Sequence, residues 1–146
     1  MGEYRNILLC LDLTEDSEKI AERAKDVAAR YGAKITLLHV VEYVPVEPMG
    51  EALLPAVQIE GELIERAKKR MEELAAKMAL QSSERMVLAG NIKAEVVRIA
   101  REQASDLIVI GSRERHGMSI LFNFTEDTVL HAAPCDVLAV RLLRAE

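Results

Sequence analysis

The chain has 146 residues, a formal net charge of −5, and aromatic side chains at only 3% of its positions. This length suits one ordinary domain, so we expect a single domain over residues 1–146. A negative charge without a cluster of Lys and Arg argues against nucleic-acid binding. No apolar run approaches the roughly 20 residues that a membrane-spanning helix needs, and no signal-peptide pattern opens the chain, so a cytoplasmic location without membrane contact is predicted.

The first third of the chain has the pattern strand, helix, strand. Residues 6–11 (NILLCL) form an uninterrupted apolar run, which is typical of a parallel strand buried on both faces. Thr14 is predicted to cap the helix that follows, and its apolar residues recur at helical spacing until Gly32 ends it. Residues 34–41 (KITLLHVV) then supply a second apolar strand. Together these elements predict a βαβ unit with a right-handed crossover.

The middle of the chain opens with a proline-rich segment. It begins at Glu42 and ends at Pro55, and its three prolines and one glycine predict an irregular loop. An amphipathic helix is expected over residues 57–78, followed by a short strand over 84–89 and a helix over 94–103.

The last third repeats the alternation. Residues 106–110 (DLIVI) predict a buried strand that stops at Gly111. A polar loop then leads into a helix over residues 119–131, and the last strand begins at Asp136 and ends at Leu143. Alternating strands and helices predict an α/β fold with three layers, in which an open parallel sheet is covered by helices on both faces.

Side chains able to bind a metal or act as a nucleophile are few. Cys10 and Cys135 lie far apart in apolar stretches, which favours small buried hydrophobes over a disulfide or a metal site. The histidines show no metal-ligand spacing, and no G-x-S-x-G motif is present, so we expect neither a metal nor a catalytic residue. His39 ends a buried strand, where it either lines a pocket or is a satisfied core residue. His131, near the end of its helix, is expected to complement the helix dipole.

Four segments, in their order and spacing, resemble the universal stress protein family: ILLCLD with Asp12 and then Thr14, LLHVV, AEVVRIAREQASDLIVIGSR, and HAAPCDVLAV. The resemblance covers essentially the whole chain. It implies a five-stranded parallel sheet in the order 3-2-1-4-5, and a homodimer in which the fifth strands, from Asp136 to Leu143, pair across a two-fold axis. The apolar residues of that strand favour such pairing, because an exposed apolar edge invites a partner. The alternative is that the C-terminal residues or a helix cover it.

Nucleotide-binding members of that family resemble one another in a G-x2-G-x9-G-[ST] loop after the fourth strand. Its glycines let the backbone approach phosphates at a helix N-terminus. The first glycine is matched by Gly111, but Glu114 stands at the second position and Phe124 at the third, followed by Thr125. Glu114 repels phosphate and Phe124 adds bulk, so the chain looks similar to the UspA-type branch, in which nucleotide binding is not expected.

Other positions still favour an adenine nucleotide. Asp12 matches the family's residue near the adenine or ribose, and Val40 or Val41 matches the position that lines the base pocket. Arg113 adds positive charge to the loop, and Gly117 supplies flexibility if the loop register is shifted. The predicted nucleotide pocket consists of Asp12, Val40, Val41, Gly111, Arg113, Gly117 and Thr125.

The sequence therefore predicts a dimeric stress-response module that binds and signals through protein contacts and carries no cofactor. The alternative is a switch operated by ATP or another adenine nucleotide. A slow ATPase or autokinase activity is a third and more distant candidate.

Overall fold

The structure is a computed structural model that describes residues 3–42, 53–113 and 129–142, and for residues 53–58 and 113 it describes the backbone alone. Its helices and strands, in chain order, are β1 (Asn6–Cys10), α1 (Ser17–Tyr31), β2 (Lys34–Val41), α2 (Leu53–Lys77), β3 (Glu84–Ala89), α3 (Ile92–Glu102), β4 (Leu107–Arg113) and β5 (Asp136–Leu142). Residues 129–132 are also helical. No helix within these ranges combines the length and apolar character needed to cross a membrane.

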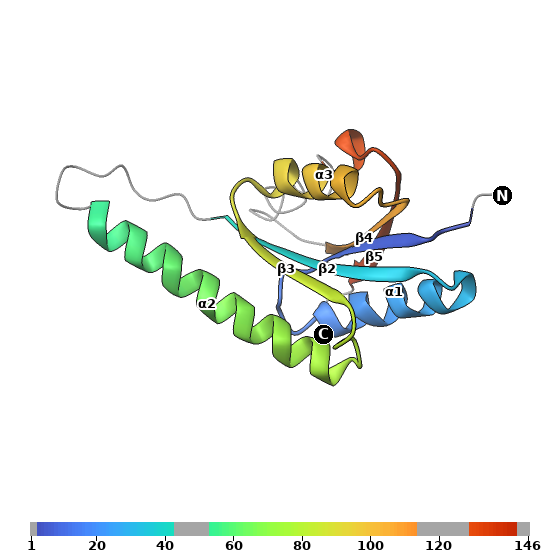
Figure 1. The fold of residues 1–146 in the computed structure, drawn as a ribbon, viewed down its shortest axis with the longest axis horizontal. Coiled ribbons are helices and arrows are strands. Elements are labelled where there is room, and N and C mark those ends of the chain that lie inside the picture. Colours follow the sequence, from blue (N-terminus) through green and yellow to red (C-terminus); the bar gives the residue numbers. More distant parts are fainter. Residues whose placement is uncertain (1–2, 43–52, 114–128, 143–146) are drawn as a thin grey trace.

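The five strands form one parallel sheet in the order β3-β2-β1-β4-β5, as predicted. Helices α1 and α2 cover one face, and α3 with the helical residues 129–132 covers the other (Figure 1). The predicted three-layer α/β fold with helices on both faces is therefore confirmed.

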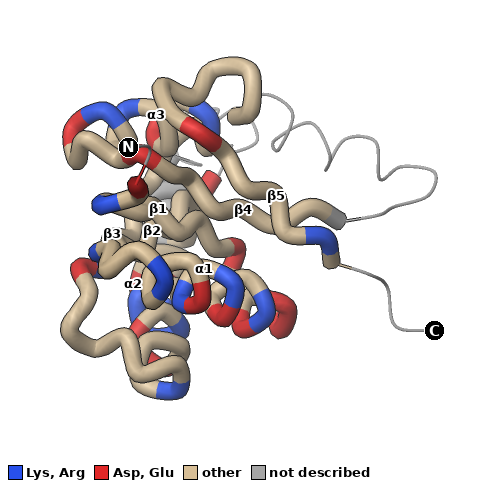
Figure 2. The backbone as a smooth tube through the Cα atoms, turned by 90° about the vertical axis from the view of Figure 1, so that its right-hand side faces the viewer, with Lys and Arg blue, Asp and Glu red and all other residues tan. Residues whose placement is uncertain are grey.

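The apolar run of β1 is explained by burial on both faces. Ile7 and Leu9 belong to the core beneath α1 and α2, whereas Leu8 and Cys10 belong to the core beneath α3. All four side chains are at most 8% exposed. Successive residues of a strand point to opposite faces, so a central strand covered on both sides has no place for a polar side chain. Figure 2 accordingly shows charged residues gathered on the helices and turns around a largely uncharged sheet.

The predicted strands over residues 34–41 and 84–89 are correct at both ends. β1 ends at Cys10 instead of Leu11, although the Leu11 N–H still donates to the Leu38 carbonyl over 2.9 Å. The fourth strand was predicted too short. It extends past Gly111 to Arg113, because Gly111, Ser112 and Arg113 continue the pairing with β5.

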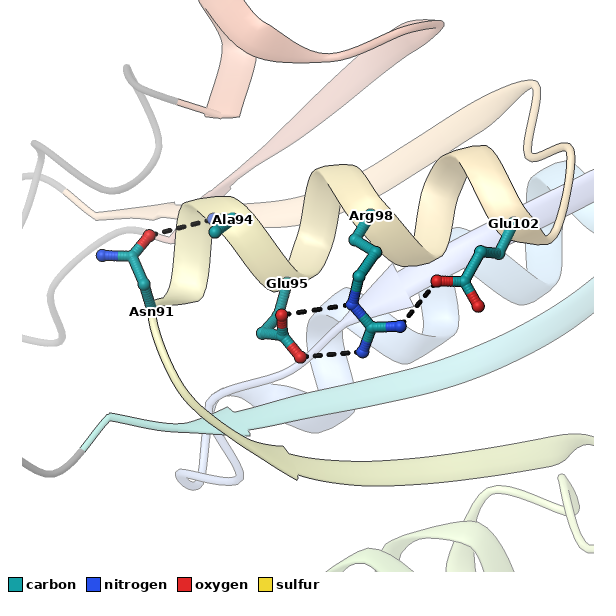
Figure 3. Close-up of polar contacts among 5 residues, drawn as sticks. All are labelled: Asn91, Ala94, Glu95, Arg98 and Glu102. Atoms are coloured by element: carbon teal, nitrogen blue, oxygen red, sulfur yellow. Dashed lines mark hydrogen bonds and ion pairs between the residues drawn. The ribbon is translucent and has the colours of Figure 1, made fainter.

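Two helices begin earlier than predicted. α2 starts at Leu53, so Pro55 falls in its first turn, where a missing N–H breaks no helical hydrogen bond. The rest of the predicted loop, residues 43–52, lies outside the described residues. α3 starts at Ile92 and ends at Glu102, because Asn91 caps it by accepting a hydrogen bond from the Ala94 N–H over 2.9 Å (Figure 3).

The outer surface of α3 is stabilised by ion pairs within the helix. Arg98 contacts Glu95 at 2.8 Å and Glu102 at 2.5 Å, one turn away on either side (Figure 3). Hydrogen bonding to Arg98 lowers the pKa of Glu95. Pairs at this spacing support a helix, but such exposed pairs contribute little because water and salt screen them.

The last strand, β5, ends at Leu142, and the predicted terminal residue Leu143 lies outside the described part of the chain. β5 is an edge strand. Three of its apolar residues, Leu138, Val140 and Leu142, pack into the core beneath α1 and α2. Their apolar character is thus explained by burial within this chain, so the pattern alone does not require a partner.

Candidate functional site

The candidate site lies at the carboxyl edge of the sheet, between β1 and β4. From β1 the chain passes to β2 on one side, and β4 lies on the other side, so the strand order reverses here. Open α/β sheets bind ligands in the crevice outside such a switch point. Asp12 follows the end of β1, and Gly111 lies near the end of β4. Both residues therefore lie at the carboxyl edge of the sheet, and their role in a nucleotide pocket stays a prediction.

Asp12 organises the turn between β1 and α1. Its Oδ1 accepts hydrogen bonds from the Thr14 N–H over 3.1 Å, the Thr14 hydroxyl over 2.8 Å and the Ser17 hydroxyl over 3.2 Å. Leu13, between them, has a φ of 59°, in the left-handed region. One carboxylate oxygen thus holds three donors and fixes a tight turn that few non-glycine residues adopt.

The prediction that Thr14 caps α1 is wrong. Asp16 stands at the N-cap position and makes no capping hydrogen bond with its side chain. The Thr14 hydroxyl donates to the Asp12 carboxylate instead of accepting from a helix N–H. A hydrogen bond to an ionised carboxylate is stronger than one between two neutral groups. Ser17, only 1% exposed, was missed by the sequence reasoning. A serine at the first position of a helix, shortly after a strand-ending Asp, is the signal that points to it.

His39 connects β2 to the same turn. Its Nδ1 donates to the Leu11 carbonyl over 2.7 Å, and because a carbonyl only accepts, Nδ1 carries a proton. The ring is half-buried. This supports the interpretation of His39 as a satisfied core residue, which also supports the loop that presents Asp12.

Val40 and Val41 were proposed as alternatives for the base pocket, and the structure separates them. Val40 belongs to the core beneath α3. Adjacent residues of a strand point to opposite faces, so Val41 points to the other side of the sheet. The two side chains cannot line the same pocket. Both are buried, at 7% and 9% exposure.

Gly111 is required by packing. A Cβ at this position would lie 2.6 Å from the Ile20 Cδ1 and 2.9 Å from the Leu142 Cδ1, closer than real Cβ contacts come. Ile20 of α1 and Leu142 of β5 are both core residues, 2% and 4% exposed. A glycine here lets α1 approach β4, whether or not a phosphate is ever bound.

The remaining loop positions of the predicted pocket cannot be placed. Gly117 and Thr125, together with Glu114 and Phe124, lie outside the described residues. Arg113 ends β4, where it pairs with Leu142, and its side chain is not described. From the predicted set, the structure places Asp12 and Gly111 near the carboxyl ends of two adjacent strands, β1 and β4.

A further carboxylate at this edge was missed by the sequence reasoning. Glu42, which follows β2, accepts a hydrogen bond from the Ile92 N–H at the start of α3 over 2.9 Å. The Gly90 N–H donates to the Val41 carbonyl over 3.1 Å, which holds the two strand ends together. Glu42 was assigned to an irregular loop, and no local pattern links it to a helix 50 positions later.

The cysteines and possible metal ligands offer no reactive centre in the described residues. Both thiols are free, and burial raises the pKa of Cys10 to about 12, so it stays protonated at neutral pH. Burial also raises the pKa of Cys135. No group of three His, Cys, Asp or Glu side chains able to hold a metal occurs within the described ranges.

Comparison with known proteins covers nearly the whole chain. The model of the universal stress protein family matches residues 3–141. Universal stress protein A homolog 2 of Coxiella burnetii is 37% identical over 143 residues, which are 97% of this chain and 98% of that protein. Its homolog 1 is 36% identical over 94% of this chain and 96% of that protein.

Solved structures share the fold at lower identity. The universal stress protein UspA of Lactobacillus plantarum superposes with a TM-score of 0.72 at 23% identity, over 95% of this chain and 99% of that one. A universal stress protein in complex with cAMP has a TM-score of 0.61 at 20% identity, over 94% and 97%. The Archaeoglobus fulgidus universal stress protein in complex with dAMP has a TM-score of 0.60 at 17% identity, over 94% and 98%. From the family model and the curated relatives, the chain belongs to the universal stress protein family.

Proposed function

We propose that this chain is a dimeric stress-response module of the cytosol that binds and signals through protein contacts, without an intact ATP loop. The observation that carries this proposal is the role of Gly111. The first glycine of the predicted phosphate loop is needed for the contacts with Ile20 and Leu142. It therefore provides no independent argument for phosphate, and Glu114 and Phe124 in the sequence oppose one.

The Asp12 carboxylate supports the same proposal. One of its oxygens is committed to Thr14 and Ser17, and a ligand that needed this oxygen would have to compete with them. In the proposed module these bonds hold the carboxyl-edge loops in shape for a protein partner.

Calorimetry with ATP, AMP and cAMP tests the absence of the ATP loop. We expect no saturable heat at millimolar nucleotide for the natural chain, because Glu114 and Phe124 block the approach of phosphates. Replacing both by glycine is expected to create binding. A saturable heat with micromolar affinity in the natural chain would overturn the proposal.

Dimerisation is tested at the free edge of β5. Ala139 is exposed on this strand, and so is Arg141 two positions later on the same face. In a two-fold pairing of β5 strands, Ala139→Lys brings like charges together, which opposes association. Sedimentation is expected to give a dimer for the natural chain and for the control Ala76→Lys on the exposed side of α2, and a monomer for Ala139→Lys. A natural chain that is monomeric at micromolar concentration contradicts the proposed dimer.

A second candidate is a switch operated by an adenine nucleotide. It is favoured by the two related structures in complex with cAMP and dAMP. Asp12 at the switch point is the described residue that such a ligand would meet. Native mass spectrometry of the freshly purified protein distinguishes the candidates, since a retained adenine nucleotide favours the switch and a bare polypeptide mass favours the protein-binding module.

A further inference from the structure

A cavity opens at the amino edge of the sheet, opposite the switch point. Its volume is about 330 Å³. The walls come from α1, from the start of β2 and from the turn that joins α2 to β3. Sites for small molecules in proteins begin at about this size, roughly 300 Å³.

The floor of this cavity is apolar and its rim is polar. Ala28, Ile35 and Leu80 line it and are themselves 5–8% exposed, so they present small patches of core to the cavity. Ser82 and Ser83 lie at the rim. Within the described part of the chain, neither serine hydroxyl makes a hydrogen bond. An apolar surface beside unused hydroxyl groups suits a ligand with an alkyl body and a polar head.

Lys25, Lys34 and Glu84 are the charged residues that line this cavity, and Lys25 is the one that is half-buried. Its half-buried side chain crosses from α1 to α2 and donates to the Met78 carbonyl over 2.5 Å. Among the described residues it forms no ion pair, whereas Lys77 in the same pair of helices pairs with Glu18 at 2.9 Å. An ammonium has three N–H donors, so two remain beyond the bond to Met78. The lining of the cavity thus holds two ammonium groups, of Lys25 and Lys34, and one carboxylate, of Glu84, which leaves one net positive charge.

We propose that this cavity binds a small monocarboxylate with a short alkyl chain. The carboxylate accepts hydrogen bonds from Lys25 and from the serine hydroxyls, and the alkyl chain lies on Ala28, Ile35 and Leu80. A single negative charge fits better than a phosphate dianion. The charges of Lys25, Lys34 and Glu84 sum to one positive charge, and the carbonyl end of α2 beside the cavity carries partial negative charge.

The probes are octanoate and 1-octanol. Their binding is measured by amide chemical shifts and by calorimetry. Octanoate is expected to shift Ala33, Ser82 and Ser83 in a saturable way. Lys25→Gln keeps a donor for the Met78 carbonyl but removes the charge. It is expected to weaken octanoate binding roughly tenfold, the loss expected for a charge-assisted hydrogen bond, and to leave 1-octanol unchanged. Lys93 is exposed on α3, across the sheet, and Lys93→Gln is the matched control. It is expected to leave the binding of both octanoate and 1-octanol unchanged.

Three outcomes overturn the proposal. They are no saturable shift with octanoate at millimolar concentration, equal binding of octanoate and 1-octanol with no effect of Lys25→Gln, and binding of inorganic phosphate in preference to octanoate. If Lys25→Gln unfolds, Ser82→Phe serves instead. Ser82 is exposed at the mouth, so the larger ring blocks entry without entering the core, and loss of the octanoate shifts in this variant supports the proposal.

Discussion

Asp12 at the carboxyl edge and Asp106 at the amino edge both bind main-chain N–H groups, but over very different distances along the chain. Asp12 bonds residues two and five positions away. Asp106 accepts from the Arg5 N–H over 2.9 Å and from the Asn6 N–H over 3.1 Å, which lie 101 and 100 positions earlier. The amino edge is thus joined by long-range contacts that hold β1 beside β4. At the carboxyl edge the turn after β1 is shaped by local bonds to Asp12, although Glu42 at the same edge reaches Ile92, 50 positions away.

Tyr4 adds a further long-range contact at the amino edge, whereas the bonds of Arg85 there span 2 to 13 positions. The Tyr4 hydroxyl donates to Asp136 at the start of β5 over 2.8 Å, and the Tyr4 ring meets Tyr31 edge to face at 5.1 Å between centroids. Hydrogen bonding to Asp136 raises the pKa of Tyr4. Arg85 joins the end of α2 to β3 through Glu72 at 2.6 Å and through the carbonyls of Gln81 and Ser83.

The largest effect is expected at Gly111. Gly111→Val places a branched side chain against Ile20 and Leu142 and is expected to lower the free energy of unfolding by about 3 kcal/mol, because the core cannot expand to accept it. Gly61→Ala is the control, since a Cβ there meets nothing within 4 Å; it is expected to raise stability by up to about 1 kcal/mol. Urea denaturation measures both. If Gly111→Val were as stable as the natural chain, the packing role of this glycine would be disproved.

Asp106→Ala is expected to cost about 2 kcal/mol, because it leaves the exposed Arg5 N–H and the partly buried Asn6 N–H without their acceptor. Asp106→Asn keeps one oxygen acceptor and should lose less stability than Asp106→Ala. Hydrogen exchange gives a site-specific measurement, with faster exchange expected at the start of β1. A uniform change in exchange across the sheet would contradict a local clamp.

Asp12→Ala is expected to cost about 1 kcal/mol, less than Asp106→Ala, because two of its three hydrogen bonds come from the exposed Thr14, whose donors find water, and only the buried Ser17 hydroxyl loses its acceptor. The turn from Leu13 to Ser17 should become mobile while the strands stay paired, which backbone relaxation by NMR detects. A larger loss of stability than that of Asp106→Ala would reverse the ranking of the two edges.

The smallest effect is expected at Glu42. Glu42→Ala removes an acceptor from the Ile92 N–H and a negative charge from the start of α3, and is expected to cost about 0.5 kcal/mol. Asn91 still caps the helix through Ala94, which limits the loss. Glu42→Gln keeps one oxygen acceptor, so its free energy of unfolding should lie between those of Glu42→Ala and the natural chain. Thermal unfolding in low salt is the suitable measurement, and an effect that survived high salt unchanged would argue against a charge–dipole origin.

Part of the site could be predicted from sequence because its residues follow strand ends. Asp12 and Gly111 come directly after or within apolar runs, and parallel strands bring such positions to one edge. The packing contacts and hydrogen bonds at this edge could not be predicted. The contact of Gly111 with Ile20 and Leu142 joins three elements, and the bond from Ile92 to Glu42 joins a helix to a distant strand end. The amino-edge cavity was equally hidden, since α1, β2 and the turn after α2 meet there only after folding.

By itself, the sequence determined the alternation of strands and helices, because burial on both faces of a parallel strand demands a continuous apolar run and a covered helix demands a spacing near 3.6 residues. Only the tertiary structure decided where those elements end and what the polar residues do. β4 extends to Arg113 because β5 lies beside it, and Lys25 turns toward α2 because the carbonyl of Met78 is there to receive it. The physical reason is the same in each case: a hydrogen bond or a close contact between distant segments depends on the position of both partners, and a local pattern specifies only one.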